Sequence, residues 1–465
     1  MLNETASTRS DHAPVRAPQA PLSREEVLHN EIRQMVASVL LIEKEAFVQD
    51  ENKSPDPTVL SGIGTQLVAT FEGTLLLDSE TAYEKLDAQL SGVRHLALFR
   101  QAKPAAGEAP NPAIQHAIHI ITGRVNTAPP RPWWPNLLLF IATFFSVLLV
   151  GAGIAVTDIQ RTNPALAEQL IENLLLALPR GLPYALSILL ILGAHELGHY
   201  FAARRHKLAV TLPYFIPLPF ISQFGTMGAF IQLRQPMKNR KMLLDVGAAG
   251  PLTGLIFAVP ILLIGLANTP LMTNAEFARL SGDPDAPLVY EGDSILYAGA
   301  KILTKGRFVP DGNVDVCIGC NQLAWAGWTG LLVTALNLIP IGQLDGGHVL
   351  YSLIGERARR LYFPLLAAMV ILVFLTEVWL IWVLLLLFFG RVYATPLDMI
   401  TPLDNRRRWI AIFALIVFVL IFVPAPLQTI SNPGTGPLLP SQNSASILPL
   451  VAPAVVALWT RLRRR

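Results

Sequence analysis

The sequence predicts a polytopic α-helical membrane protein that carries a small soluble α+β domain in its N-terminal part. Hydrophobic residues make up 52% of the 465 residues and charged residues only 15%, whereas a typical soluble protein has about 25% charged residues. The charge is also uneven, because the first 134 residues hold 28 of the 69 charged side chains. The remainder of the chain is therefore expected to lie in a membrane.

Charge and cysteine content exclude two other classes of protein. The formal net charge is only +3, so nucleic-acid binding has no electrostatic support. Two cysteines in a chain of this length cannot form a disulfide scaffold. The lipid bilayer is the partner that the composition indicates.

The N-terminal part is expected to contain a disordered tail and a folded domain. Residues 1–22 are rich in Pro, Ala and Ser and contain no apolar run, which is typical of disorder. Residues 23–128 are expected to form a cytoplasmic α+β domain with a leading helix. Nothing in this segment indicates chemistry, so a regulatory or docking role is expected.

Capping residues and alternating hydrophobicity predict the elements of this domain. Ser23 and Glu26 have the spacing of a capping box, which predicts a helix over 24–49. Thr81 and Glu84 have the same spacing and predict a short helix that ends near Leu90. Strands are expected where apolar and polar residues alternate, at 58–77, 93–100 and 114–125.

A proline-rich segment with two tryptophans, 129–135, separates the soluble part from the membrane part. Tryptophan is enriched at membrane–water interfaces. Beyond this segment, a helical span needs about 20 apolar residues. Candidate spans are 137–157, 183–204, 246–267, 325–344, 361–389, 409–423 and 447–460.

The stretch 361–389 contains Glu377 and is either one span or a hairpin of two short spans. The hairpin is favoured because it places all clusters of Lys and Arg on one side of the membrane. The chain is then expected to have six to eight spans, eight in the favoured arrangement, with both termini cytoplasmic. Residues 135–355 would form the core, and 356–465 would add the C-terminal spans.

The span 183–204 ends in His195, Glu196, Leu197, Gly198 and His199. Two histidines at i and i+4 lie on one helical face. This spacing allows both imidazoles to bind one Zn²⁺ with the glutamate beside it as a general base. The alternative is a polar helix end with two solvated histidines, but ionisable groups inside a membrane helix are usually functional.

A catalytic zinc site of this kind needs a third protein ligand and an open position. The candidate is Asp345, which follows the uncharged run 321–344. An unpaired carboxylate at that depth is costly, and a metal ion would stabilise it. The alternative is an ordinary Asp-Gly turn at a helix end. In the expected topology Glu196 and Asp345 lie toward the same side of the membrane.

These motifs together resemble the site-2 protease family of intramembrane zinc metalloproteases. The similarity includes HELGH inside a span, the segment 337–348 about 140 residues later, and the stretches 224–229 and 247–254. It covers about a third of the chain, 185–355. The resemblance implies an endopeptidase that cleaves peptide bonds in or near transmembrane segments of membrane-protein substrates.

The resemblance also implies roles for single residues. His195, His199 and Asp345 would bind one Zn²⁺ per chain, and Glu196 would activate water. Asn337 matches a family asparagine near the site and is a candidate to stabilise the oxyanion; alternatively it makes a contact between helices. His348, three residues beyond Asp345, is not expected to be a ligand; alternatively it contacts one of the ligands without binding the metal itself.

The sequence differs from many bacterial members of this family. Only 57 residues, 268–324, separate the third and fourth spans, which is too few for a PDZ domain. The soluble N-terminal domain and the extra C-terminal spans resemble the PDZ-less cyanobacterial and chloroplast branch. The expected location is a bacterial plasma membrane, with a thylakoid or chloroplast membrane as the alternative.

The segment 211–235 contains Pro213, Pro217 and Pro219, which disfavour a spanning helix. It is expected to form a re-entrant β-hairpin near the active site that pairs with an unwound substrate by strand addition. The alternative is a passive loop that covers the site.

Cys317 and Cys320 form a CxxC pair on the outer side of the expected topology. They form a structural disulfide, remain inert thiols, or have a redox or metal-binding role.

Two other functions compete with proteolysis. A catalytically silent scaffold or membrane chaperone of the same fold would not need the HExxH residues or Asp345, yet all of them are present. A transporter would show internal repeats, and HExxH has no counterpart in the second half of the chain.

Overall fold

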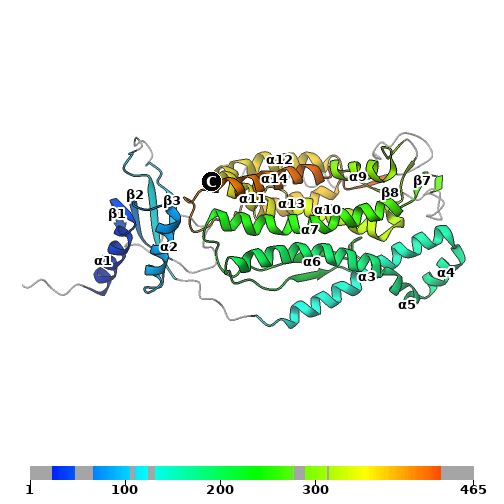
Figure 1. The fold of residues 1–465 in the computed structure, drawn as a ribbon, viewed down its shortest axis with the longest axis horizontal. Coiled ribbons are helices and arrows are strands. Elements are labelled where there is room, and N and C mark those ends of the chain that lie inside the picture. The colour runs from blue at the N-terminus through cyan, green and yellow to red at the C-terminus, as the bar shows by residue number, and fades with distance from the viewer. Residues whose placement is uncertain are drawn as a thin grey trace, which may run out of the picture. The chain divides into compact units, whose positions relative to one another are not determined.

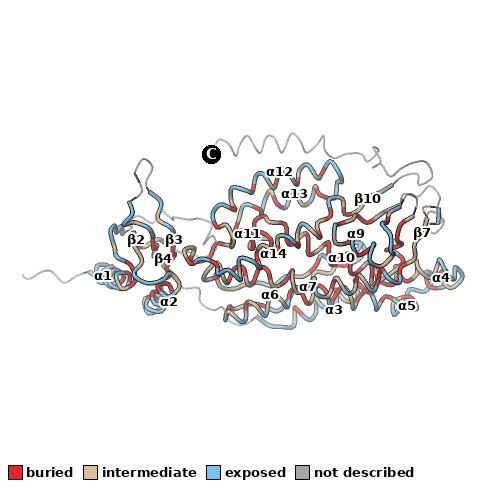
Figure 2. The backbone as a smooth tube through the Cα atoms, turned by 45° about the horizontal axis from the view of Figure 1, so that its top comes forward, coloured by how far each residue is buried: buried red, intermediate tan, exposed pale blue. Residues whose placement is uncertain are grey.

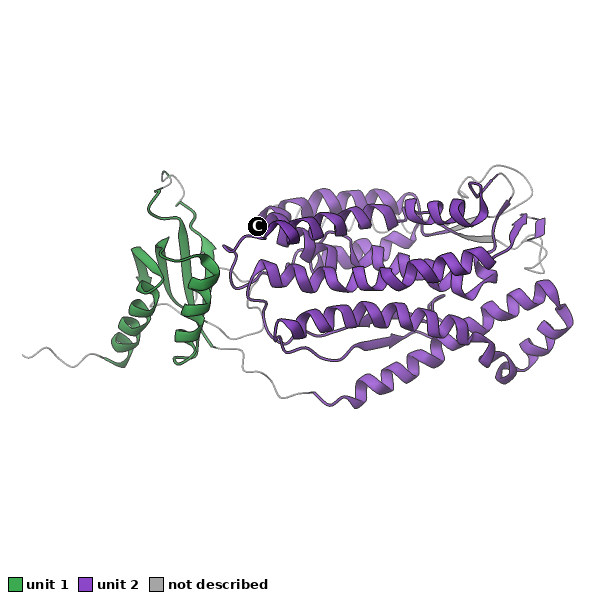
Figure 3. Ribbon diagram, in the orientation of Figure 1, with its two compact units in different colours: residues 1–53, 66–124 green, residues 54–65, 125–465 purple. Residues whose placement is uncertain are grey.

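The computed structural model describes residues 23–47, 66–104, 109, 111–123, 131–273, 275–276, 288–311 and 314–430. The chain divides into two compact units (Figure 3), one formed by residues 1–53 and 66–124 and the other by 54–65 and 125–465. The expected disordered tail, 1–22, and the expected last span, 447–460, lie outside the described residues.

The first unit is a four-stranded antiparallel sheet with two helices. The strand order is β1-β2-β4-β3, and its core contains Phe71 and Phe99 from the sheet and Leu86 from α2. The predicted small α+β domain is therefore confirmed. Its elements are α1 (Arg24–Ala37), β1 (Leu40–Phe47), β2 (Leu67–Leu75), α2 (Ser79–Leu90), β3 (His95–Gln101) and β4 (His116–Thr122).

The first helix is shorter than predicted. The capping box between Ser23 and Glu26 is present, but the helix ends at Ala37, and the residues from Leu40 to Phe47 form a strand. This strand pairs with β2, with Leu40 opposite Leu75. The predicted helix is therefore confirmed over 24–37 and wrong over 40–47, where pairing with a distant strand outweighs local helix preference.

The second helix begins earlier than predicted. The side chain of Asp78, rather than Thr81, caps it by accepting a hydrogen bond from the amide of Thr81. The strand predicted over 58–77 is observed as β2, whereas 58–65 lies outside the described residues.

In the part of the chain that the structure describes, three helical stretches are long and apolar enough to cross a membrane: Trp134–Thr162, Leu174–Arg205 and Arg240–Asn268. They include the first three predicted spans. Many of their apolar side chains are exposed, such as Leu138 and Phe201, as expected for lipid-facing surfaces. The elements are α3 (Trp134–Thr162), α4 (Pro164–Glu172), α5 (Leu174–Ala177), η1 (Leu178–Gly181), α6 (Leu182–Arg205) and α7 (Arg240–Asn268).

The fourth predicted span, 325–344, is interrupted. Helix α10 (Gln322–Asn337) ends seven residues early, and α11 (Asp345–Ile354) begins after a turn. Pro340 lies in this turn and has no backbone N–H. Gly342 has a φ of +61°, and a Cβ there would lie 2.7 Å from Cα of Gly390. The turn therefore excludes a continuous helix.

The C-terminal part contains a helical hairpin. Helices α12 and α13 are separated by the turn 374–377, which contains Glu377, and the Tyr362 hydroxyl donates to the carbonyl of Leu386 near the other end of the hairpin. These helices have 12 residues each and α14 has 17, which is short for a span of about 20 residues. Their bounds are η3 (Gly355–Leu361), α12 (Tyr362–Val373), α13 (Val378–Phe389) and α14 (Asn405–Ile421).

Helices α6, α7 and α10 pack against one another at the centre of the second unit (Figure 1). Figure 2 shows that their mutual faces are buried, whereas outer faces of the surrounding helices are exposed. Leu262 of α7 and Trp328 of α10 belong to this core. The hairpin of β5 (Tyr214–Pro217) and β6 (Thr226–Phe230) contacts α3 and α6. The remaining short elements are β7 (Leu271–Thr273), β8 (Leu288–Glu291), α9 (Ile295–Lys305), β9 (Val314–Val316), η2 (Ile318–Cys320) and β10 (Leu427–Ile430).

Candidate active site

Helix α6 carries three polar side chains into the interior of the second unit. His195, Glu196 and His199 are only 3%, 6% and 6% exposed. Because the histidines are four residues apart, their rings lie on one face of the helix, with the ring centres 5.0 Å apart. Burial excludes the alternative of two solvated histidines at a helix end.

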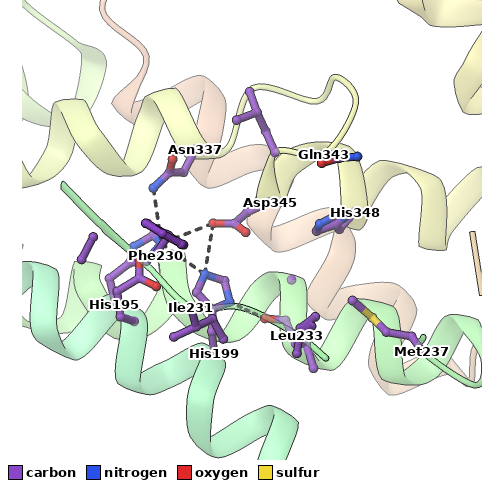
Figure 4. A pocket seen from close by; sticks show the side chains of 15 residues that line it. His195, His199, Phe230, Ile231, Leu233, Met237, Asn337, Gln343, Asp345 and His348 are labelled. Atoms are coloured by element: carbon purple, nitrogen blue, oxygen red, sulfur yellow. Dashed lines mark hydrogen bonds and ion pairs between the residues drawn. The ribbon is translucent and has the colours of Figure 1, made fainter. Parts of the chain in front are cut away.

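Asp345 lies directly against these histidines (Figure 4). Its Oδ2 is 3.3 Å from Nε2 of His195 and 3.2 Å from Nε2 of His199, and the two Nε2 atoms are 3.2 Å apart. Asp345 is the first residue of α11, so the turn between α10 and α11 brings it to α6. Three potential ligand atoms therefore converge from two distant helices.

The donor set fits a Zn²⁺ ion. Nδ1 of His199 lies 2.7 Å from the carbonyl oxygen of Val246, which can only accept, so the neutral ring carries its proton on Nδ1 and leaves the Nε2 lone pair free for a metal ion shared with Asp345. In a tetrahedral zinc site with bonds of about 2.0–2.1 Å, ligand atoms lie about 3.3 Å apart. The observed separations agree with this spacing.

Glycines of α7 make room for the histidine rings. A Cβ on Gly250 would lie 2.1 Å from Nε2 of His199, and a Cβ on Gly254 would lie 3.2 Å from Cβ of His195. Both glycines belong to the stretch 247–254, which the sequence indicated only as part of the resemblance. The signal for their role is their spacing of four residues on one face of a membrane helix, which permits close helix approach.

Glu196 is beside the three converging atoms but is not one of them. It lines the same cavity, and the backbone of Ile231 forms a hydrogen bond to it. Ile231 follows β6, which pairs with β5 as an antiparallel hairpin. The structure therefore places the predicted β-hairpin next to the HExxH helix.

Asn337 is the last residue of α10 and reaches the same place. Its Nδ2 is 3.4 Å from Nε2 of His195. A side-chain amide can donate a hydrogen bond to an oxygen that develops negative charge. The position is compatible with the oxyanion role and with the alternative of a contact between α10 and α6.

A cavity of about 230 Å³ opens at these residues. Besides the predicted site residues, Phe230, Gln343 and Met237 line it (Figure 4). The sequence placed Phe230 in the predicted hairpin and Gln343 in the motif 337–348 without a role for either, and it gave no signal for Met237. His348 also lines it, and its buried Nδ1 has no hydrogen-bond partner among the described residues. Their positions in the cavity depend on packing between segments, so the folded chain is needed to show that they line it.

Cys317 and Cys320 are joined by a disulfide. They lie in the 3-10 turn η2 that precedes α10, at the opposite end of this helix from Asn337. Pro270 accepts a hydrogen bond from the amide of Cys317. The pair is therefore separate from the cluster on α6 and α11.

Comparison with known proteins agrees with the motifs. Residues 183–381 match the model of peptidase family M50, the site-2 protease family. A probable zinc metalloprotease EGY2, chloroplastic, of Arabidopsis thaliana is 29% identical over 372 residues, which are 78% of this chain and 61% of that protein. A probable zinc metalloprotease EGY1, chloroplastic, of Oryza sativa subsp. japonica is 28% identical over 306 residues, 62% of this chain and 50% of that protein.

The chain thus spans about three fifths or less of the length of these curated relatives. No solved structure matches it significantly. The matched region contains HExxH, Asn337 and Asp345. The predicted resemblance to the site-2 protease family is therefore confirmed.

Proposed function

We propose that this chain is an intramembrane zinc metalloendopeptidase that hydrolyses peptide bonds in or near transmembrane segments of membrane proteins. One observation carries the proposal: Nε2 of His195, Nε2 of His199 and Oδ2 of Asp345 lie 3.2–3.3 Å from one another beside the buried Glu196. The helices around them have apolar exteriors. The match to peptidase family M50 and relatives named probable zinc metalloproteases support the same activity.

His195, His199 and Asp345 would hold the zinc ion. When bound, zinc polarises a scissile carbonyl and lowers the pKa of a water molecule toward 7. Glu196 is held near the ligands without being one, so its carboxylate can take the proton of the attacking water. It would then deliver that proton to the nitrogen of the leaving amine.

Asn337 would act on the carbonyl oxygen of the scissile bond. Its amide lies 3.4 Å from Nε2 of His195, close enough to reach a carbonyl oxygen held at the ligand cluster. A donor aimed at developing negative charge typically contributes 10²–10³-fold to the rate. Asn337 is therefore assigned to oxyanion stabilisation.

The strand β6 would hold the substrate in an extended conformation. A peptide bond in a helix hides its carbonyl, so a transmembrane substrate must unwind before cleavage. Gln232 exchanges hydrogen bonds with Thr211 on the β5 side. Because bonding direction alternates along a strand, the amides of Ala229 and Ile231 face away from β5, and within the described residues no third strand pairs there.

The shorter helices α10, α12, α13 and α14 complete the membrane part in this proposal. With the three long helices and the predicted span 447–460, they would give the expected six to eight spans, with both termini cytoplasmic. Residues 23–128 form the cytoplasmic domain, 135–355 the proteolytic core and 356–465 the C-terminal spans. The names of the relatives favour a chloroplast or thylakoid membrane over the bacterial plasma membrane expected from the sequence.

The first experiment measures zinc in the detergent-purified chain by elemental mass spectrometry. We expect about one zinc per chain in the native protein and almost none in Asp345→Ala. Asp404→Ala is the matched control, because this exposed carboxylate caps α14 and does not line the cavity at the cluster. Zinc retained in Asp345→Ala would break the proposed ligand set.

The second arm separates a protease from a catalytically silent scaffold or chaperone. Glu196→Gln keeps the size of the side chain and removes the base. It should bind zinc as the native chain does but cleave a reconstituted single-span substrate at least about 100-fold more slowly. A zinc-loaded native chain that cleaves no transmembrane substrate would favour the scaffold.

A further inference from the structure

A second cavity, of about 300 Å³, lies at the end of α6 where the chain leaves the helix. Three arginines from separate segments line it: Arg131 before α3, Arg204 at the end of α6, and Arg234 after β6. No Asp or Glu is among its described lining residues. The cavity thus concentrates positive charge contributed by three parts of the chain.

Hydrogen bonds between separate segments fix the polar wall of this cavity. The side-chain amide of Asn136, 7% exposed, donates to the carbonyls of Leu212 and Pro213 at 2.8 and 3.0 Å. The amide of Arg234 donates to the carbonyl of Ala209. These bonds hold the loop after α6 and the segment after β6 against the start of α3.

Two of the arginines have no carboxylate partner in the described structure. Neither Arg131 nor Arg204 forms an ion pair with another described residue, and both side chains are exposed. The hydroxyl-bearing rings of Tyr200 and Tyr214 also line the cavity. Guanidinium groups hold phosphate oxygens through paired N–H donors, and phenols add single donors.

Apolar side chains around the cavity are exposed at the surface of the protein. Trp133 and Trp134 are 64% and 56% exposed, Phe201 of α6 is 64% exposed, and Leu212 is 42% exposed. Tryptophans of this kind mark the headgroup level of a membrane. A soluble anion would bind to the arginines and leave the apolar surface exposed to water. A lipid would bind to the arginines through its headgroup and cover the apolar surface with its acyl chains.

We propose that this cavity binds the phosphate group of an anionic membrane lipid, with the acyl chains along the exposed apolar side chains of α3 and α6. Basic pockets between transmembrane helices bind anionic headgroups for the same electrostatic reason. The site is distinct from the cluster on α6 and α11. Arg234 nevertheless follows Leu233, which lines the catalytic cavity, so a bound lipid would brace the segment after β6.

The test is native mass spectrometry of the full chain in detergent, titrated with phosphatidylglycerol. Native protein should retain the lipid, and Arg131→Gln/Arg204→Gln should bind it at least about 10-fold more weakly. The matched control is Arg205→Gln/Arg406→Gln, which removes two charges from a different cavity. Equal binding by the native and the Arg131/Arg204 variant, or equal loss in the control, would overturn the proposal.

Two further arms identify the source of the phosphate group and guard against misfolding. Inorganic phosphate that binds as tightly as phosphatidylglycerol, and competes with it, would overturn the lipid assignment in favour of a free anion. Phosphatidylcholine should bind more weakly than phosphatidylglycerol. Arg131→Lys/Arg204→Lys should restore much of the binding, and an unchanged zinc content shows that each variant is folded.

Discussion

At the scale of single residues, the ring of His199 depends on a missing side chain in the neighbouring helix. Gly250 of α7 lies so close that a Cβ would be 2.1 Å from Nε2 of His199. An imidazole displaced from this place cannot direct its Nε2 lone pair at a metal ion shared with Asp345. Close packing of α6 against α7 is therefore a requirement of the proposed metal site, not only of stability.

Gly250→Ala should lower zinc affinity at least about 10-fold, because real Cβ atoms do not approach a ring this closely and the ring must move. Zinc competition with a chelator measures the effect. Gly153→Ala is the matched control, since nothing lies within 4 Å of its added Cβ in α3. Unchanged affinity in Gly250→Ala would show that α7 can shift to accept the methyl group.

Asn337→Ala should lower kcat about 10²–10³-fold while KM and zinc content change little, because the amide acts on charge that develops only in the transition state. The measurement is steady-state cleavage of a reconstituted substrate. If Asn337 is only a contact between helices, the melting temperature should fall while kcat is retained.

At the scale of elements, the hairpin of β5 and β6 lies beside the HExxH helix. The edge of β6 that faces away from β5 carries the amide of Ala229, which faces the cavity in the proposed arrangement. The backbone of Ile231, the first residue after β6, forms a hydrogen bond to Glu196. The hairpin would thus connect substrate binding to the general base. This is the arrangement that strand addition requires.

Ala229→Pro should slow cleavage about 10-fold or more, because it removes a backbone donor on the free edge and leaves the bonds to β5 in place. Ala229→Gly keeps this donor and should retain most activity. Both variants are assayed for zinc content and thermal stability on the same sample. Full activity in Ala229→Pro would indicate that β6 is a passive cover of the site.

In the segment of the chain that connects α7 to α10, a buried charged cluster holds β8, α9 and β9 together. Nζ of Lys301, fully buried, lies 3.6 Å from Glu291, 3.0 Å from Asp293 and 3.2 Å from Asp315. Tyr297 donates its hydroxyl to Glu291 at 2.8 Å. Burial raises the pKa of Glu291 to about 7, and the charge of Asp315 also raises it, whereas Lys301 lowers it.

The pKa of Glu291 predicts a pH dependence of stability. In the unfolded chain this pKa is about 4.5, so between pH 4.5 and 7 the folded state binds the proton more tightly. The contribution of Glu291 to the free energy of unfolding is therefore complete below pH 4.5. It is lost as the pH rises to 7, and the loss is at most about 3 kcal/mol. Glu291→Gln should make the melting temperature nearly independent of pH over this range. Glu168→Gln, which changes an exposed carboxylate, should leave the pH dependence as it is in the native chain.

At the scale of the whole second unit, basic residues gather at one end of the helices. Arg240 at the start of α7 donates to the carbonyl of Ser352 in α11, and Arg407 of α14 pairs with Asp245 of α7. Lys207 follows α6 at the same end, whereas α9 lies beyond the other end of α7 (Figure 1). This distribution agrees with the positive-inside rule.

The proposed topology predicts which positions a membrane-impermeant maleimide can reach. Both native cysteines are in a disulfide, so a single introduced cysteine is the only free thiol. In intact bacterial cells that express the chain in their plasma membrane, Leu303→Cys and Arg307→Cys should be labelled, whereas Lys207→Cys and Arg360→Cys should be labelled only after permeabilisation. Labelling of all four before permeabilisation would contradict this topology.

The sequence alone determined what depends on local order. Composition marked a membrane part and a soluble part, and the i, i+4 spacing placed His195 and His199 on one face of a helix. The motif around Asp345 carried the resemblance to the site-2 protease family. These features depend on periodicity and residue type within one segment, and the amino-acid sequence of that segment carries this information.

Only the tertiary structure decided what depends on packing between segments. It ended the first helix at Ala37 because β2 pairs with the following residues, and it broke the fourth predicted span at Asn337. It also brought Oδ2 of Asp345 to 3.2 Å from His199, 146 residues away, with Gly250 clearing the space between helices. Such approaches depend on the shapes of distant surfaces, and the spacing of residues along a chain does not contain that information.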